Sequence, residues 1–427
     1  MNSRKKILVL ALGLVTVHNA HATNGYFAHG YGVKAQGTGG VGIALPQDAL
    51  AAATNPAGMA LIGNRADVGL TLFNPDREAT LSSTAGGSGM LDGTFDGNGR
   101  ENFLIPEGGY NRFIKDNVTL GVSVYGNGGM NTEYEQPIAL LSGASGTTSG
   151  IDYIQLFVAP TVAWKITDGQ TLGVSVNLGY QRFKATGIDN FTFISASPAN
   201  VTGLGVDDGY GIGLHLGWTG ELTDAITLGA TYQTRTNFSR FDDYKGLFAN
   251  EGEMDAPASY GIGISIEASP QLTIAADVQR ILYSDVAAIG NPLSLWNGQP
   301  FVSGGPGNLG TGTGPGFGWD DVTVLKIGFN YAVNDALTLR GGYDHTEQPV
   351  QESETLFNIL APGVVQDHLS LGATWTLANS AELSVAYTHA FENSVSGVDV
   401  IPLPFGGGDV ALKMHQDSLG IAYGWKF

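Results

Sequence analysis

The sequence contains no cysteine, few charged residues and, beyond its first two dozen residues, no long apolar run. Its 427 residues include no Cys, and only 14% are Asp, Glu, Lys or Arg. The lack of thiols excludes disulfide bonds, thiolate metal sites and cysteine nucleophiles. Acidic residues outnumber basic ones 39 to 20. The chain therefore lacks the basic surface that phosphate binding needs, and no nucleic-acid partner is expected.

Glycine, by contrast, is abundant. The chain has 63 Gly, and hydrophobic residues make up 43% of it. This much glycine disfavours helices, whereas the apolar fraction is too high for a disordered chain. No stretch after residue 22 reaches the roughly 18 uninterrupted apolar residues of a transmembrane helix. If the chain enters a membrane, it must do so as β-strands.

The first residues have the pattern of a secretory signal peptide. Three basic residues at 4–6 precede an apolar run over 7–17, and an A-x-A cleavage signal follows at 20–22. The run is too short to cross a bilayer as a helix, which takes about 20 residues. We therefore expect residues 1–22 to be a cleaved signal peptide.

From about residue 66 onward, apolar residues alternate with small or polar ones. Near the C-terminus, for example, Leu419, Ile421 and Tyr423 share one face, and Gly420 and Ala422 the other. Short turns alternate strictly with long Gly-rich links, which is typical of an outer-membrane barrel with short periplasmic turns and long external loops. The fourteen strands are predicted at about 66–84, 99–114, 118–129, 151–166, 171–186, 208–222, 226–240, 253–268, 271–284, 321–333, 336–347, 365–378, 381–392 and 411–427.

The predicted fold is therefore all-β, a 14-stranded antiparallel transmembrane β-barrel over residues 65–427. A soluble half-buried sheet would also alternate, but the pattern of connections argues against it. Trp164, Trp218, Trp375 and Trp425 lie near short turns and fit an interfacial aromatic girdle. The long links are expected at about 85–98, 130–150, 187–206, 241–252, 285–320, 348–364 and 393–410.

Residues 23–64 do not alternate. They are rich in Gly and Ala, with one short helix expected over 47–53 and ended by Asn55-Pro56. A fourteen-stranded barrel encloses a lumen wider than side chains alone fill, so we expect this segment inside it as a hatch, or plug. A periplasmic tail is the alternative. The glycines over 37–42 match a dinucleotide fingerprint, but no βαβ unit surrounds them, so no cofactor is expected.

Residues 24–60 carry a specific resemblance. They read NGYFAHGYGVKAQGTGGVGIALPQDALAAATNPAGMA, which resembles the N-terminal hatch of the FadL/TodX family of outer-membrane transporters for long-chain fatty acids and other hydrophobic compounds. The resemblance implies a fourteen-stranded barrel plugged by a small hatch, in agreement with the strand count. The family's Asn-Pro-Ala motif falls on Asn55, Pro56 and Ala57, which together with Gly58 are the expected gating residues.

The resemblance also implies a lateral opening in the barrel wall. In the family, the third strand is kinked inward and leaves a gap towards the lipid. Clustered glycines weaken strand pairing and allow such a bend, although an ordinary Gly-rich loop is the alternative. The matching residues are Tyr125, Gly126, Asn127, Gly128 and Gly129.

Two kinds of residue are candidates for ligand binding. By resemblance, Phe183 falls on a pocket-lining position, but a basic residue expected four places later falls on Gly187, which gives weight to a neutral substrate. Lys326 and Arg340 oppose apolar neighbours on their strands and should face the lumen, because a charge facing lipid costs about 2–4 kcal/mol. There they either tie the wall to the hatch or meet a substrate carboxylate. The full candidate set is Tyr26, Phe27, Phe183, Lys326 and Arg340.

Two outer links add a candidate capture site. The apolar stretches 137–141 and 191–194 resemble the hydrophobic groove that the family builds from its outer loops, with ordinary loop packing as the alternative.

The predicted function is passive, hatch-gated uptake of hydrophobic compounds across a bacterial outer membrane, in the first place of long-chain fatty acids, with lateral exit through the wall. Aromatic or alkane hydrocarbons are the alternative substrates. A structural or adhesive surface barrel is the alternative of another class, and a general porin is disfavoured because residues 23–64 would block it. Expected partners are the substrate, outer-membrane lipid and lipopolysaccharide, and the barrel-assembly machinery.

No enzyme activity, catalytic residue or metal site is predicted. The six histidines after residue 22 are not spaced as metal ligands, and no paired-histidine motif is present. His389 follows the outward phase of its strand, where an outer-membrane phospholipase would carry a catalytic histidine, but no serine partner accompanies it.

Overall fold

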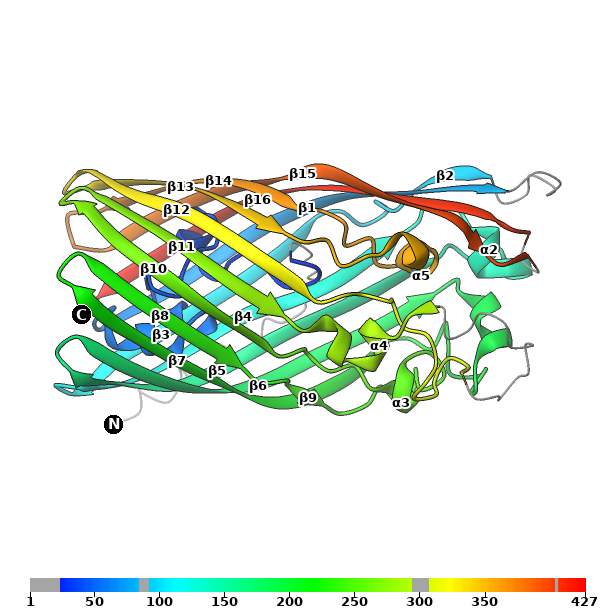
Figure 1. Ribbon diagram of the computed structural model, residues 1–427, viewed down its shortest axis with the longest axis horizontal. Coiled ribbons are helices and arrows are strands. Elements are labelled where there is room, and N and C mark those ends of the chain that lie inside the picture. Colours follow the sequence, from blue (N-terminus) through cyan, green and yellow to red (C-terminus); the bar gives the residue numbers. More distant parts are fainter. Residues whose placement is uncertain (1–23, 84–91, 294–306, 404–405) are drawn as a thin grey trace, which may run out of the picture.

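The fold is a closed antiparallel β-barrel (Figure 1). In the computed structural model, the structure describes residues 24–83, 92–293, 307–403 and 406–427. The signal peptide predicted at 1–22 lies outside these residues. No helix in the described part of the chain is long and apolar enough to cross a membrane.

Fourteen strands form the wall, which confirms the number predicted from the alternation. The last strand returns to pair with the first, from Arg65↔Lys426 to Ser83↔Gly408. Two short strands, β2 and β9, pair with β1 and β7 without joining the wall. The bounds are β1 Arg65–Ser83, β2 Gly93–Asp96, β3 Phe103–Lys115, β4 Val118–Glu133, β5 Gly150–Thr167, β6 Gln170–Thr186, β7 Asp207–Thr223, β8 Ile226–Gln233, β9 Asn237–Phe238, β10 Ser259–Ser269, β11 Leu272–Ile281, β12 Val322–Asn334, β13 Leu337–Thr346, β14 Asp367–Thr376, β15 Glu382–Ile401 and β16 Gly408–Lys426.

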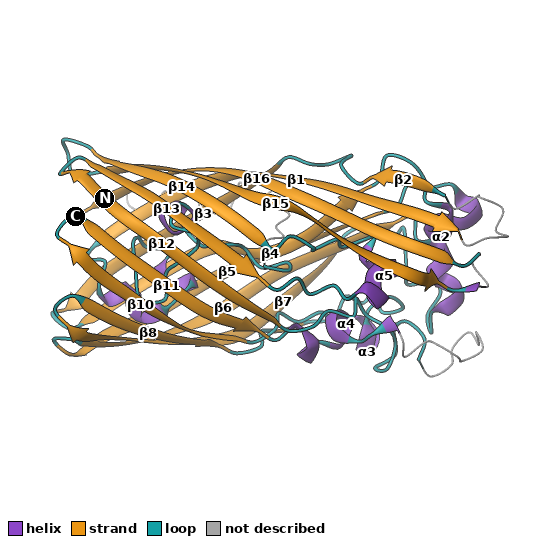
Figure 2. Ribbon diagram, turned by 45° about the horizontal axis from the view of Figure 1, so that its top comes forward, coloured by secondary structure: helices purple, strands orange, loops and turns teal. Residues whose placement is uncertain are grey.

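Short helical turns lie at both ends of the barrel. Figure 2 shows α2 to α5 gathered at the end opposite the C-terminus, among the long links. The bounds are α1 Val33–Gln36, η1 Ala51–Ala53, η2 Pro56–Ala60, α2 Ala139–Ser142, η3 Gly143–Ser145, η4 Asp189–Ile194, α3 Ala249–Gly252, η5 Tyr283–Asp285, α4 Ala287–Gly290, η7 Glu352–Glu354 and α5 Thr355–Asn358.

The middle of β6 follows the predicted assignment of the two faces. Ser175, Asn177 and Gln181 are fully buried, whereas Leu178, with its apolar side chain, is 45% exposed. Small and polar residues here point inward and apolar residues outward, as a barrel surrounded by lipid requires. Nearer the long links the inward positions also carry buried aromatic residues, such as Phe183 on β6 and Tyr153 on β5.

Three local predictions were wrong in detail. The outer link expected over 393–410 is shorter, because β15 continues to Ile401 through a register shift after Gly397. The strand expected to reach residue 240 stops at Gln233. The helix expected over 47–53 is only a 3-10 turn, η1.

Asn55 begins a helical turn rather than ending one. Its side chain caps η2 by accepting a hydrogen bond from the backbone N–H of Ala57, and Pro56 takes the first position. Both residue types are favoured there, because Asn satisfies a free N–H and proline has none to satisfy.

Candidate functional site

The N-terminal segment, residues 24–64, lies within the barrel, and most of its residues are buried (Figure 1). Its backbone is held by carboxylates that point inward from the wall. The hydrogen bonds run from Ala49 N–H to Asp67 (2.9 Å), from Gly32 and Val33 N–H to Glu107 (3.1 and 2.9 Å), and from Gly42 and Ile43 N–H to Asp277 (2.8 and 3.0 Å).

Lys326 and Arg340 also contact this segment. The Lys326 ammonium donates to the backbone oxygen of His29 at 2.8 Å. The Arg340 guanidinium donates to the side-chain oxygen of Gln47 at 3.0 Å. Both contacts tie the wall to the N-terminal segment, which was one of the two interpretations of these residues. That either one meets a substrate stays a prediction.

Asn55 links the N-terminal segment to the wall at a second place. Its buried amide nitrogen donates to the backbone oxygens of Ile43 (2.7 Å) and of Trp218 on β7 (3.0 Å). Its side-chain oxygen accepts from Ala57 N–H at 3.1 Å. One side chain therefore fixes two parts of the segment and one wall strand.

Wall glycines make room for this contact. A side chain at Gly173 on β6 would overlap the backbone of Pro56, and one at Gly217 on β7 would overlap Asn55. The predicted gating residues thus pack closely against the wall, and Gly58 beside them packs against Pro46. Their gating role stays a prediction.

We expect Asn55→Ala to loosen this contact. The change removes the donor to two carbonyls, and each buried polar group left unsatisfied costs about 1–3 kcal/mol. The N-terminal segment should become more sensitive to protease, and small polar solutes should leak faster into proteoliposomes. Asn64→Ala is the matched control, because the Asn64 side chain accepts a hydrogen bond from the backbone N–H of Phe113 on β3, away from the contact of Asn55 with β7. Equal leakage through both variants would contradict the expectation.

Strands β3 and β4 of the wall separate beside the glycine-rich end of β4. The pairing of β3 with β4 runs only as far as Gly108↔Val124, although β4 continues on its other side along β5 to Glu133. A bulge between Gly126 and Gly128 leaves Asn127 without a ladder partner. The bulge bends β4 away from β3 at the stretch that the resemblance matched to the lateral opening.

Part of the N-terminal segment, inside the barrel, pairs with the edge of β4 that β3 leaves free. The backbone N–H of Gly129 donates to the oxygen of Tyr26 at 3.0 Å, and that of Ala28 donates to the oxygen of Asn127 at 3.1 Å. Phe27 and Gly128 form an antiparallel bridge between these bonds. Residues 26–28 therefore occupy the place of a neighbouring strand at the parting.

Aromatic rings surround this point. The Tyr26 ring lies 5.2 Å from that of Phe27, 5.8 Å from that of Tyr153 and 5.4 Å from that of Tyr283, measured between centroids. Trp319 lies 6.2 Å from Tyr26 and completes the group. Two of the candidate ligand-binding residues, Tyr26 and Phe27, thus share one buried aromatic cluster.

Above this cluster, towards the long links, lies an apolar pocket. Phe183 is part of its lining, and the rings of Phe241, Tyr244 and Phe248 lie within 5.8 Å of the Phe183 ring. We call this cavity the outer pocket. It is lined by Ile151, Phe183, Phe191, Leu247, Phe248, Ala288, Leu309, Pro315, Gly316, Phe317, Phe357 and Leu360.

A second pocket shares Phe191 and Phe357 with the outer pocket. Leu140, Leu141 and Ile194 line it, so the structure brings together the two apolar stretches that were candidates for a capture site. The two pockets are therefore neighbours among the long links.

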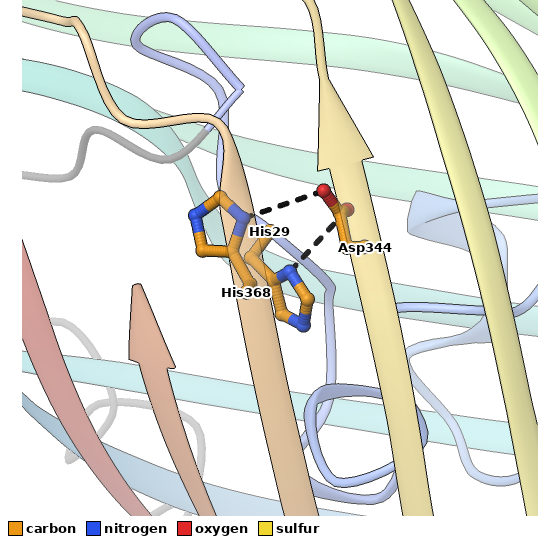
Figure 3. A group of neighbouring side chains, drawn as sticks. All are labelled: His29, Asp344 and His368. Atoms are coloured by element: carbon orange, nitrogen blue, oxygen red, sulfur yellow. Dashed lines mark ion pairs between the residues drawn. The ribbon is translucent and has the colours of Figure 1, made fainter. Parts of the chain in front are cut away.

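One polar group inside the barrel was not predicted. His29 of the N-terminal segment and His368 of β14 both face the carboxylate of Asp344 on β13 (Figure 3). Each Nδ1 lies 3.4 Å from a carboxylate oxygen. Burial lowers the pKa of the His29 imidazole and so favours its neutral form. The nearby Asp344 carboxylate acts in the opposite direction. The residues come from three separate parts of the chain, so no local spacing indicates them.

Known proteins resemble this chain over its whole length. A family model described as outer membrane protein transport protein (OMPP1/FadL/TodX) matches residues 19–422. A putative outer membrane protein of Neisseria meningitidis serogroup B is 24% identical over 475 aligned positions, which cover 100% of this chain and 99% of that protein.

Solved structures share the fold. A Pseudomonas aeruginosa FadL homologue matches with a TM-score of 0.69 at 17% identity, covering 94% of this chain and 100% of that one. The Pseudomonas putida toluene transporter TodX matches with a TM-score of 0.66 at 19% identity, covering 95% and 100%. At these identities the likeness concerns the fold alone.

Proposed function

This chain belongs to the OMPP1/FadL/TodX family of outer membrane transport proteins, and from that premise we propose that it carries neutral hydrophobic compounds from the outer pocket to a lateral opening beside β4. It is an outer-membrane transporter of hydrophobic compounds and not an enzyme. A passive transporter needs only a concentration gradient, and apolar burial of about 0.8 kcal/mol per CH₂ favours entry into the pocket.

The observation that carries the choice of substrate is the chemistry of the outer pocket. All twelve lining residues are apolar, and none of those described is Lys, Arg or His. A carboxylate placed there would lose its water without gaining a partner, which is costly. A neutral hydrocarbon meets no such penalty, so this lining favours aromatic or alkane compounds over fatty acids.

Aromatic contacts support a route from the pocket to the wall. Phe183 in the pocket lining is the ladder partner of Tyr153 on β5. The ring of Tyr153 lies 5.8 Å from that of Tyr26, whose backbone oxygen is bound by Gly129. A compound leaving the pocket would therefore move along rings to the parting between β3 and β4.

The gate in this proposal is the short stretch at residues 26–28. Two backbone hydrogen bonds hold it to β4, and each is worth only about 0.5–1.5 kcal/mol. Asn55 is bound more firmly, through its three hydrogen bonds. We therefore expect the residues next to β4 to move during transport and the turn at Asn55-Pro56 to act as their anchor.

Long-chain fatty acids remain the second candidate. A cavity between the N-terminal segment and the wall is lined by Phe27, Tyr31 and Lys326, among others. A carboxylate that reached this cavity would meet the Lys326 ammonium, which suits such pairing.

Uptake by whole cells tests the proposal. The chain is expressed in a Gram-negative host that lacks its own long-chain fatty-acid transporter, and uptake of labelled toluene and oleate is compared with that of cells carrying an empty vector. Toluene should enter several-fold faster and oleate should not. Faster oleate uptake that is lost in Lys326→Met would move the substrate to fatty acids. If neither compound enters faster through a folded barrel, the transport proposal fails and a structural or adhesive role takes its place.

A further inference from the structure

The group formed by His29, His368 and Asp344 is buried and not accounted for by transport. Asp344 and His368 are fully buried, and His29 is 6% exposed. Both oxygens of Asp344, both ring nitrogens of His368 and the Nδ1 of His29 find no hydrogen-bond partner among the described residues. Leaving this many buried polar atoms unsatisfied is costly, so the arrangement needs a physical reason.

The spacing within the group does not fit hydrogen bonds. Each imidazole nitrogen lies 3.4 Å from the nearest Asp344 oxygen, whereas N–H···O hydrogen bonds cluster near 2.9–3.0 Å. The same wall contains two histidine–aspartate pairs that do bond. His345 lies 2.7 Å from Asp367, and His389 lies 2.9 Å from Asp417. The buried group is therefore wider than the ordinary pairs of this protein.

The spacing does fit two ligands of one metal ion. Zinc binds imidazole nitrogen and carboxylate oxygen at about 2.0–2.2 Å in a tetrahedron, which puts neighbouring ligand atoms about 3.3–3.5 Å apart. The two 3.4 Å distances run to different oxygens of Asp344, Oδ2 for His29 and Oδ1 for His368, and the three ligand atoms all lie within 4.8 Å of one another. Two imidazoles and one carboxylate form a common catalytic or regulatory ligand set, with a fourth position open to water or an anion.

A neighbouring serine orients one of the ligands. The Nε2 of His29 lies 3.2 Å from the hydroxyl of Ser370, which is also 2.9 Å from that of Thr388. If Nε2 donates its proton to Ser370, the lone pair of Nδ1 is directed at Asp344. Metal-binding histidines are oriented in this way by the group that their other nitrogen contacts.

Lys326 places a positive charge beside the group, because its ammonium lies 3.9 Å from Oδ2 of Asp344, the oxygen that His29 faces. That ammonium is already held by the backbone oxygens of His29 (2.8 Å) and Gly40 (3.4 Å). Its charge should make an anionic fourth ligand more favourable than water.

We propose that His29, His368 and Asp344 bind a divalent transition metal of the zinc class, and that this ion fastens the N-terminal segment to β13 and β14. His29 is the only one of the three that belongs to the segment, so the ion would cross-link two parts that otherwise meet through hydrogen bonds. The inference rests on these contacts alone and does not depend on which compound the barrel carries.

Cobalt binding tests the site directly. The full-length protein is purified in detergent, stripped with a chelator and titrated with Co²⁺, whose visible d–d bands report nitrogen and oxygen ligands in a tetrahedral field. One Co²⁺ should bind per chain and be displaced by Zn²⁺. His368→Gln and His29→Gln should abolish the bands, and Ser370→Ala should weaken binding roughly 10-fold.

His345→Gln is the matched control. It removes a histidine from the same strand as Asp344, but one whose partner is Asp367, so binding should be unchanged. Heat-modifiable mobility on gels shows that each variant is folded. Added Zn²⁺ should also protect the N-terminal segment of the parent protein from protease, and not that of His368→Gln. Absence of stoichiometric binding to the folded parent, or bands that persist in His368→Gln, would overturn the proposal.

Discussion

Deletion of Asn127 is expected to reduce uptake to the level of cells that lack the protein. Asn127 is the extra residue of the bulge between Gly126 and Gly128, which pair with Leu156 and Gln155. Without it, the ladder with β5 becomes regular and β4 is no longer bent. Its outer half can then pair with the free edge of β3, each added hydrogen bond contributing about 0.5–1.5 kcal/mol. The parting through which we expect the compound to leave would close.

Two controls are needed. One separates the effect of the bend from that of losing the Asn127 side chain, and the other separates it from the effect of deleting any strand residue. Asn127→Ala keeps the bulge and removes only the side chain, so uptake should persist. Deletion of Val333 removes one residue from another bulge, between Ala332 and Asn334 at the far end of β12, and should leave uptake unchanged. Labelled-toluene uptake is the measurement, with heat-modifiable mobility to show folding. If the Asn127 deletion folds and transports normally, the compound leaves by another path.

A second large effect is expected from Ala288→Phe, which should raise the half-saturating concentration for uptake roughly 10-fold. Ala288 lies on α4, is 3% exposed and lines the outer pocket. A phenyl ring there occupies space that the compound needs in this pocket. The loss should appear at low substrate concentration and grow with the size of the hydrocarbon.

The neighbouring residue provides the comparison. Ala287 lies on the same turn, is half-buried and does not line the outer pocket. Ala287→Phe adds the same ring beside the cavity and should leave the half-saturating concentration near that of the parent. Equal effects of the two substitutions would indicate a disturbed loop rather than a filled binding site.

Most of the barrel wall could be predicted from the sequence, but less of the structure inside the barrel could. Alternation places side chains by a simple rule, so the fourteen strands and the inward direction of Lys326 and Arg340 followed from it. The same rule also applies to Asp67 and Glu107. They share the inward phase of their strands and bind the backbone of the N-terminal segment.

Other features depend on partners that are distant in the sequence. The end of β15 was missed because its register shift is defined by pairing with β16 rather than by its own residues. The link from Asn55 to the wall was missed because the carbonyl that its side chain binds, at Trp218, belongs to another strand. His29, Asp344 and His368 meet only once the lumen is built.

The distribution of contacts around the N-terminal segment has a consequence for the order of folding. Its backbone ligands Asp67, Glu107 and Asp277 belong to β1, β3 and β11, and the Lys34 ammonium binds Glu382 on β15 at 2.6 Å. These strands surround a common space only after β16 has paired with β1. All of these contacts can form together only after the barrel has closed, so we expect the N-terminal segment to acquire its final structure late in folding.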